Sequence, residues 1–304
     1  MKKHKKIHYD ILGLMSVCFL MGIFLAVPVK AEAATFQTGW GSDKMKTGKY
    51  YVWVDDKSDS VVVSTSQSGD GRVIATASGK REMNGSFMSD GSTVFYAEKI
   101  YKEDYALDYI YKISIQGKRR TYIGKMKDMN NFEACYGGNL YVSCWDFRED
   151  YQGEFDPCHI YRINIKTGKT KCVVKNATVD SQYKRYLLAS APTDAAYAPR
   201  NFYVFDCKTE KAVRIGKNIR FASFSANKVY YAEGINDTAI RVLSCSLSGK
   251  NKKTIVKKLT VDGGAGVGRI TSKYVYYLKG GKPRRYNIKT KKSEKISEKK
   301  YLSW

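Results

Sequence analysis

The chain has 304 residues and is strongly basic, with 53 Lys and Arg against 29 Asp and Glu and a formal net charge of +24. This length fits one large domain as well as two smaller ones. Tyrosine is abundant (24 residues) and proline scarce (5 residues), a balance typical of pleated, half-exposed strands. Because no apolar period of 3.6 residues persists beyond the N-terminal segment, the composition argues against a helical protein.

The first 33 residues have the three parts of a secretory signal peptide. Four lysines in residues 1–10 precede an apolar run, Ile11–Val29, and an Ala31-x-Ala33 cleavage motif follows. We predict cleavage after Ala33, so that residues 34–304 are secreted or associated with the cell envelope. An uncleaved membrane anchor is the alternative, because about nineteen apolar residues nearly suffice to span a bilayer.

A short aromatic strand recurs six times beyond the leader. The copies begin at Tyr51, Val94, Leu140, Tyr186, Val229 and Val275, which places them 43 or 46 residues apart. Strand-rich repeats of 40 to 50 residues are typical of β-propellers. The even spacing leaves no stretch long enough for a second domain.

Each repeat holds further strand signals around its aromatic strand. A short apolar stretch precedes it, and an alternating strand, a tight polar turn and another short strand follow it, as in residues 161–174 and 243–256. Four short strands per repeat make a propeller blade. We therefore predict an all-β fold: residues 34–304 as one β-propeller of about six blades of four antiparallel strands, closed into a ring.

The repeats resemble a known family over about five of the six units, and one repeat illustrates the resemblance. Its matching residues are Val229-Tyr230-Tyr231, Ile240-Arg241, Leu247-Ser248-Gly249 and Ile255-Val256. This pattern resembles the YWTD-type propeller repeats of the low-density-lipoprotein-receptor family and of secreted bacterial relatives. The chain departs from the family at the aspartate of the aromatic strand, where Ala232-Glu233 and Ala97-Glu98 stand. The resemblance implies a six-bladed fold and extracellular binding, and it supplies no catalytic residues.

The turns between the third and fourth strands of the blades are basic. These turns should form a basic ring on one face that binds an anionic cell-wall polymer or a membrane surface. The alternative is that their charges only keep the protein soluble and its edges unpaired. The predicted polyanion-binding residues are Lys118, Arg119, Arg120, Lys166, Lys169, Lys250, Lys252, Lys253, Lys291 and Lys292.

Two long loops on the opposite face are acidic and aromatic. They span residues 98–109 and 145–157, and long loops on a rigid scaffold are common binding sites. We predict that their rings stack on a sugar, a peptide or a cation; alternatively, the rings pack on each other. The predicted ligand-binding residues are Tyr101, Tyr105, Tyr109, Trp145, Phe147, Tyr151 and Phe155. Calcium is a lesser alternative among the carboxylates of residues 146–156.

Six cysteines follow the leader, an even number that permits disulfides in an exported chain. If residues 140–163 form a hairpin folded about residue 151, Cys144 lies opposite Cys158, close enough to form a disulfide. The alternative is that all six are buried thiols. A zinc site is not indicated, because there is no C-x-x-C pair and His159 is the single histidine beyond the leader.

The motifs of common hydrolases, G-x-S-x-G and H-E-x-x-H, are absent from the sequence. We therefore expect a non-catalytic binding or scaffold protein that recognises an extracellular protein, a glycan or an anionic wall polymer. We expect it to be monomeric, without a cofactor or a metal and without a nucleic-acid partner. The alternative is a carbohydrate-active hydrolase or lyase that uses inner-strand carboxylates. Glu133 and Asp180 are the inner-strand acids, and the sequence shows no evident pairing between them.

Overall fold

The structure is a computed structural model that describes residues 36–146, 158–191, 200–263 and 266–302. The predicted signal peptide, residues 1–33, lies outside the described residues. Within them, no helix is long and apolar enough to cross a membrane.

The described chain is almost entirely β-structure. In chain order the strands are β1 Gln37–Trp40, β2 Met45–Thr47, β3 Tyr50–Asp55, β4 Ser60–Ser64, β5 Arg72–Thr76, β6 Glu82–Ser89, β7 Thr93–Tyr101, β8 Ala106–Ser114, β9 Thr121–Lys127, β10 Met129–Tyr136, β11 Asn139–Trp145 and β12 Cys158–Asn164. They continue with β13 Thr170–Val174, β14 Thr178–Tyr183, β15 Tyr186–Ser190, β16 Arg200–Asp206, β17 Lys211–Ser225, β18 Lys228–Asn236, β19 Ala239–Ser246, β20 Lys253–Thr260, β21 Val267–Ile270, β22 Tyr274–Lys279, β23 Lys282–Asn287 and β24 Ser293–Lys295. One short helix, α2, spans Glu298–Leu302.

The strands form five antiparallel sheets that follow each other along the chain. Three have four strands: β2 to β5, β10 to β13 and β21 to β24. In the five-stranded sheet, β1 precedes β6 to β9, and the seven-stranded sheet runs from β14 to β20. The long strand β17 joins two units there, because its first half pairs with β16 and its second half with β18. The all-β propeller-type fold is therefore confirmed, whereas the number of six blades stays a prediction.

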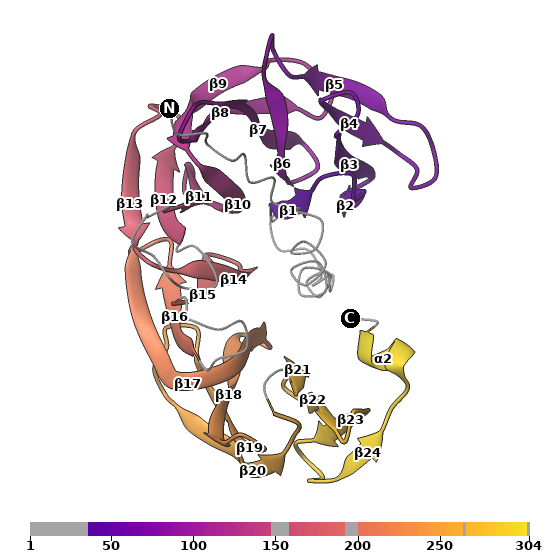
Figure 1. The fold of residues 1–304 in the computed structure, drawn as a ribbon, viewed down its shortest axis with the longest axis vertical. Coiled ribbons are helices and arrows are strands. Elements are labelled where there is room, and N and C mark those ends of the chain that lie inside the picture. The colour runs from indigo at the N-terminus through magenta and orange to yellow at the C-terminus, as the bar shows by residue number, and fades with distance from the viewer. Residues whose placement is uncertain (1–35, 147–157, 192–199, 264–265, 303–304) are drawn as a thin grey trace, which may run out of the picture.

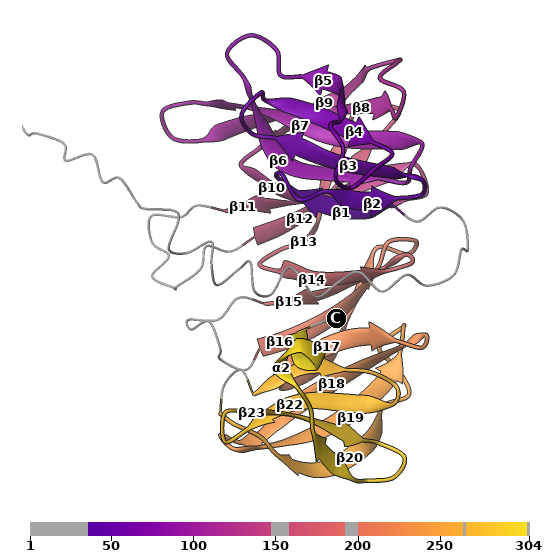
Figure 2. The ribbon, with the colours of Figure 1, turned by 90° about the vertical axis from the view of Figure 1, so that its right-hand side faces the viewer.

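The sheets stand around a common centre like the blades of a propeller. Figure 1 shows them in an arc, with β10 and β14 toward the middle and β9 and β13 at the periphery. Turned by 90°, the sheets of the two chain ends lie at opposite ends of the molecule, with β14 and β15 between them (Figure 2). Successive inner strands are in contact, as β6 is with β10 and β10 with β14.

The predicted closed ring is wrong for the described part of the chain. No strand pairing there joins the first sheet, β2 to β5, to the last, β21 to β24, and Figure 1 shows the arc open between them. The N-terminal strand β1 does not bridge this opening, because it pairs with the inner strand β6. Gly39 makes that pairing possible: a Cβ at this position would lie 2.3 Å from the Phe87 ring.

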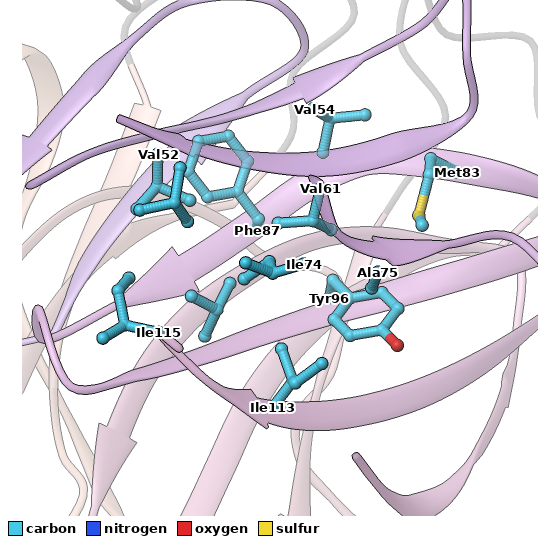
Figure 3. Packing of buried hydrophobic residues seen from close by; sticks show 12 residues of the cluster. Val52, Val54, Val61, Ile74, Ala75, Met83, Phe87, Tyr96, Ile113 and Ile115 are labelled. Carbon is cyan, nitrogen blue, oxygen red and sulfur yellow. The ribbon is translucent and has the colours of Figure 1, made fainter. Parts of the chain in front are cut away.

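Apolar residues between neighbouring sheets hold the arc together. Between the first sheet and β6 to β8, Val52, Phe87 and Tyr96 are fully buried, together with aliphatic side chains of both sheets (Figure 3). Similar clusters fill the later sheet interfaces. At roughly 25 cal/mol per Å² of apolar surface, this burial is the main force that keeps successive sheets stacked.

The tight turns of the five hairpins that follow β8, β12, β16, β19 and β23 all contain a left-handed residue near their centre. Gly117, Gly168 and Gly249 occupy this position with φ between 68° and 78°, as glycine does readily. Where the sequence has no glycine, Glu210 (φ 52°) and Lys291 (φ 56°) take the same conformation. Glu210 and Lys291 correspond to Gly168, because all three donate their N–H to the carbonyl four residues earlier, whereas Gly117 and Gly249 donate to the carbonyl three residues earlier. The left-handed conformation costs about 1 kcal/mol at each of the two non-glycine positions.

The predicted register of the third sheet is wrong by one residue. In the β11–β12 pair, Cys144 lies opposite His159 and Cys158 lies opposite Trp145. A shift of one residue turns a side chain to the other face of the sheet, so the two sulfurs do not face each other. Both cysteines are buried thiols that form no disulfide in the structure, as the alternative interpretation expected.

Candidate functional site

Two inner strands carry an acidic residue at a β-bulge. In the β10–β11 pair, Phe132 and Ala134 face consecutive residues of β11, so Glu133 is the extra residue. The β14–β15 pair has the same irregularity between Val179 and Ser181, which makes Asp180 the extra residue. A bulge redirects a side chain out of the regular alternation of a strand. Both side chains are half-buried rather than sealed in the core.

Glu133 is held in a protonated form near neutral pH. The pKa of its carboxyl is raised to about 7, mainly by burial and less by the negative charge of Asp180, against a hydrogen bond from Ser143 that lowers it. The Ser143 hydroxyl donates to Glu133 Oε1 at 2.6 Å and accepts from the Asn131 main-chain N–H at 3.2 Å. Ser143 is 1% exposed, so the serine has little freedom and orients the carboxyl.

Asp180, unlike Glu133, has a cation beside it. Burial raises the pKa of its carboxyl above the usual value, and the Arg200 guanidinium and a hydrogen bond with Ser190 oppose this rise without cancelling it. Arg200 Nη2 lies 3.5 Å from Asp180 Oδ1, and Arg200 Nη1 donates to the Ser190 hydroxyl at 2.9 Å. Asp180 Oδ2 is buried and has no hydrogen-bond partner in the described residues.

The two carboxyl groups can therefore take different roles, one as a proton donor and the other as a base. The pKa of Glu133 is about 7, so this carboxyl can donate a proton near neutral pH, while Asp180 is the acid whose negative charge a neighbouring cation, Arg200, stabilises. Two carboxyl groups in different surroundings are a common arrangement for acid and base catalysis. The supporting residues Ser143 and Ser190 stand near the ends of β11 and β15, so the pair lies toward one side of the sheets.

Three of the aromatic residues predicted to bind a ligand do come together. Tyr101 and Tyr105, in the hairpin between β7 and β8, line a cavity of about 360 Å³ with Trp145 at the end of β11. An adjoining cavity of about 240 Å³ shares Asp104, Asp128 and Trp145 with it. We call the two cavities the rim pocket. It lies on the side where β7 and β11 end, the side to which the Ser143 end of the carboxylate site also belongs.

The other predicted aromatic residues are not part of the rim pocket as described. Tyr109 lies on β8 under the Arg81 guanidinium, whose carbon is 3.7 Å from the ring centroid, and its ring also contacts that of Tyr122. Phe147, Tyr151 and Phe155 lie outside the described residues. Among the residues that are described, no group of three or more His, Cys, Asp or Glu side chains can hold a metal ion.

The predicted polyanion-binding residues are all exposed in the structure. Arg120 differs from the rest because its guanidinium forms an ion pair with the buried carboxylate of Glu98 and lies 4.0 Å from the centroid of the Tyr111 ring. The remaining residues of the set are solvent-exposed charges on hairpins, and polyanion binding by them stays a prediction.

The sequence names Glu133 and Asp180 but does not reveal that they interact, and it misses Ser143, Ser190 and Arg200. The two acids are far apart along the chain, and they influence each other because their strands, β10 and β14, belong to neighbouring sheets that are in contact. A weak signal exists, since a serine ends the otherwise apolar segments around Tyr141 and Leu188.

Comparison with known proteins identifies the fold. No protein-family profile and no curated protein sequence matches the chain. Solved structures do match: a prolyl endopeptidase aligns with a TM-score of 0.51 at 12% identity, over 92% of this chain and 43% of its own. An oligogalacturonate lyase in complex with manganese aligns at 0.46 and 10%, over 86% and 78%. The β-propeller domain of the Trilobed protease from Pyrococcus furiosus aligns at 0.44 and 13%, over 69% and 68%.

These likenesses correct the expected function. The sequence-based interpretation took the propeller repeat as a sign of a non-catalytic binding or scaffold protein, but the solved structures of this fold include a prolyl endopeptidase. The expectation that the chain is not an enzyme is overturned on that finding. The chain spans less than half the length of the endopeptidase. At 10–13% identity the likeness shows the fold alone, so any reaction has to be argued from this chain's own residues.

Proposed function

We propose that the protein is a carbohydrate-active hydrolase or lyase in which Glu133 is the proton donor and Asp180 the base. The observation that supports it is the half-buried Glu133 carboxyl, with a pKa of about 7, which interacts electrostatically with an Asp180 whose charge Arg200 stabilises. Breaking a glycosidic bond requires such a pair, because the leaving oxygen needs a proton and a second group must take one up.

In both reactions, one carboxyl group supplies the proton that the leaving oxygen needs and the other takes up the proton that is released. In hydrolysis, Glu133 protonates the leaving oxygen as the bond to the anomeric carbon breaks, and Asp180 removes a proton from the water that attacks this carbon. In elimination from a uronate, Asp180 takes the proton from the carbon beside the sugar carboxylate, the neighbouring carbon–oxygen bond breaks, and Glu133 protonates the leaving oxygen. Arg200, the cation beside Asp180, is placed to stabilise the carboxylate of such a substrate.

A panel of neutral and uronate-containing polysaccharides tests this proposal. New reducing ends without ultraviolet absorbance indicate hydrolysis, and absorbance of an unsaturated product indicates elimination. Glu133→Gln and Asp180→Asn should each lower the rate by about 10²–10⁴-fold. Glu298→Gln, on the exposed helix α2, is the matched control and should leave it unchanged. Full activity in both site variants, or no cleavage of any polysaccharide by the unaltered protein, would refute the proposal.

The pH dependence is a second test of the same roles. Since Glu133 must be protonated, the rate should fall as the pH rises through about 7. The ionised form of Asp180 is lost in acid, so the rate should also fall at low pH and the profile should be bell-shaped. In the Glu133→Gln variant the alkaline limb should disappear from the residual activity.

We also propose that this enzyme acts outside the cell on an extracellular or cell-envelope glycan. The support is the signal-peptide pattern of residues 1–33 and its Ala31-x-Ala33 motif. N-terminal sequencing of the protein recovered from the culture medium of an expressing bacterium should read from Ala34. Recovery of the chain only in the cell interior, with Met1 retained, would contradict this localisation.

A further inference from the structure

We propose that the rim pocket is a sugar-binding subsite for an uncharged glycan, separate from the carboxylate pair. Its walls combine aromatic rings with charges of both signs. Tyr101 is 65% exposed and Tyr105 37% exposed, an unusual degree for large side chains that border a cavity. Aromatic faces stack on the C–H faces of sugar rings, as they do on other apolar surfaces.

The charges of the pocket select against ions. Lys99 and Lys102 line the larger cavity together with Glu103, Asp104 and Asp128. A cationic ligand would be repelled by the lysines and an anionic one by the carboxylates. A neutral molecule with both hydroxyl donors and hydroxyl acceptors can satisfy ammonium and carboxylate groups at once, and sugars fit this requirement.

The pocket is preformed by Asp128, which ties its two sides together. Asp128 Oδ1 accepts from the Ala106 main-chain N–H at 2.7 Å, at the base of the β7–β8 hairpin. The Asp128 main-chain carbonyl accepts from the Trp145 N–H at 2.8 Å, on the neighbouring sheet. Asp128 has φ of 50°, a conformation that costs energy and is often found at functional sites.

The tyrosine rings are also positioned by neighbours within the pocket region. Lys127 Nζ lies 4.8 Å from the centroid of the Tyr105 ring, and Lys99 Nζ lies 5.7 Å from that of Tyr101. Each ammonium is within the range of a cation–π contact, which restrains the ring without covering it. A cavity of about 360 Å³ falls in the size range of small-molecule sites, about 300–1,000 Å³.

Titration calorimetry with uncharged hexasaccharides of β-glucose, α-glucose and N-acetylglucosamine tests this inference. The Glu133→Gln variant is the starting protein, because it lacks the proposed proton donor and so slows turnover during the titration. Hexagalacturonate and hexalysine are the charged comparison probes. We expect at least one neutral probe to bind and the two charged probes to bind more weakly at the same ionic strength.

Substitutions assign the binding to the rim pocket. Tyr101→Ala and Tyr105→Ala should each weaken binding roughly tenfold, the effect of losing about 1.4 kcal/mol of ring stacking. Tyr122→Ala is the matched control, since Tyr122 is 51% exposed on the same sheet and does not line either cavity. Circular dichroism of each variant verifies that it is folded.

The results separate this inference from the proposed function. Neutral-sugar binding that survives Glu133→Gln and Tyr122→Ala but is weakened by Tyr101→Ala supports the subsite, whether or not the protein cleaves glycans. Preferential binding of either charged probe, equal loss in the Tyr122→Ala variant, or no binding of any neutral hexasaccharide at millimolar concentration would overturn it.

Discussion

Replacing Glu133 by glutamine should stabilise the protein in neutral and alkaline solution. The folded protein raises the pKa of this carboxyl from 4.5 to about 7, so ionisation of Glu133 is more costly in the folded than in the unfolded chain. Glutamine has nearly the same shape, keeps an acceptor for the Ser143 hydroxyl and carries no charge. The variant therefore lacks the cost that the carboxylate imposes.

The magnitude follows from the difference between the two pKa values. At 1.36 kcal/mol for each pH unit, a rise from 4.5 to about 7 corresponds to about 3 kcal/mol. Below pH 4.5 both states of the unaltered protein hold the proton, and the cost is absent. It grows as the pH rises from about 4.5 to about 7 and is then constant. The unfolding free energy of the variant, relative to the unaltered protein, should rise by up to about 3 kcal/mol over this interval.

Urea unfolding followed by tryptophan fluorescence measures this difference at a series of pH values. The two proteins should have equal slopes against urea, so that the shift in midpoint reports stability alone. Glu298→Gln is the control, since this exposed carboxyl should give a difference that does not depend on pH. A Glu133→Gln difference that is flat between pH 4 and 8, or that favours the unaltered protein at pH 8, would refute the reasoning.

Two further predictions concern packing. Gly39→Ala should destabilise the protein by about 1–3 kcal/mol in urea unfolding, because the added Cβ lies 2.3 Å from the Phe87 ring and must displace β1 or the ring; an unchanged midpoint would contradict the β1–β6 pairing. Tyr141→Phe should cost about 1–2 kcal/mol, because the Tyr141 hydroxyl donates to the buried carbonyl of Cys207 at 2.8 Å. Tyr96→Phe is its control: this buried hydroxyl has no hydrogen-bond partner among the described residues, so its removal should be neutral or stabilising, and equal losses in both variants would be inconsistent with the assigned bond.

The positions of the strands could be predicted because the repeat is a local signal. The six predicted aromatic strands correspond to β3, β7, β11, β15, β18 and β22, and each begins within one residue of its predicted start. These strands are the buried second strands of their units. Their runs of apolar residues and the turns that flank them can therefore be recognised in the sequence. The polar turn of the outer hairpins is equally local, even where Glu210 replaces glycine.

The predictions that were wrong, and the site residues that were not predicted, depend on strand register and on contacts between strands and sheets. One residue of slip in the β11–β12 pair was enough to remove the predicted Cys144–Cys158 pairing. The bulges at Glu133 and Asp180 cannot be recognised in the alternation of apolar and polar residues, although they determine where these side chains lie. The contact of Arg200 with Asp180 arises across three strands of one sheet, and ring closure depends on the fit between the two ends of the chain.

The central claim is that Glu133 keeps its proton near neutral pH because of burial and the charge of Asp180. Carbon-13 NMR of the glutamate side-chain carboxyls, with the Glu133 signal assigned by its loss in Glu133→Gln, measures this directly. The account predicts a titration midpoint near 7 that falls in the Asp180→Asn variant but stays above 4.5, because burial is the larger cause of the raised pKa. A midpoint near 4.5 in the unaltered protein, or one that does not move when Asp180 is neutralised, would contradict it.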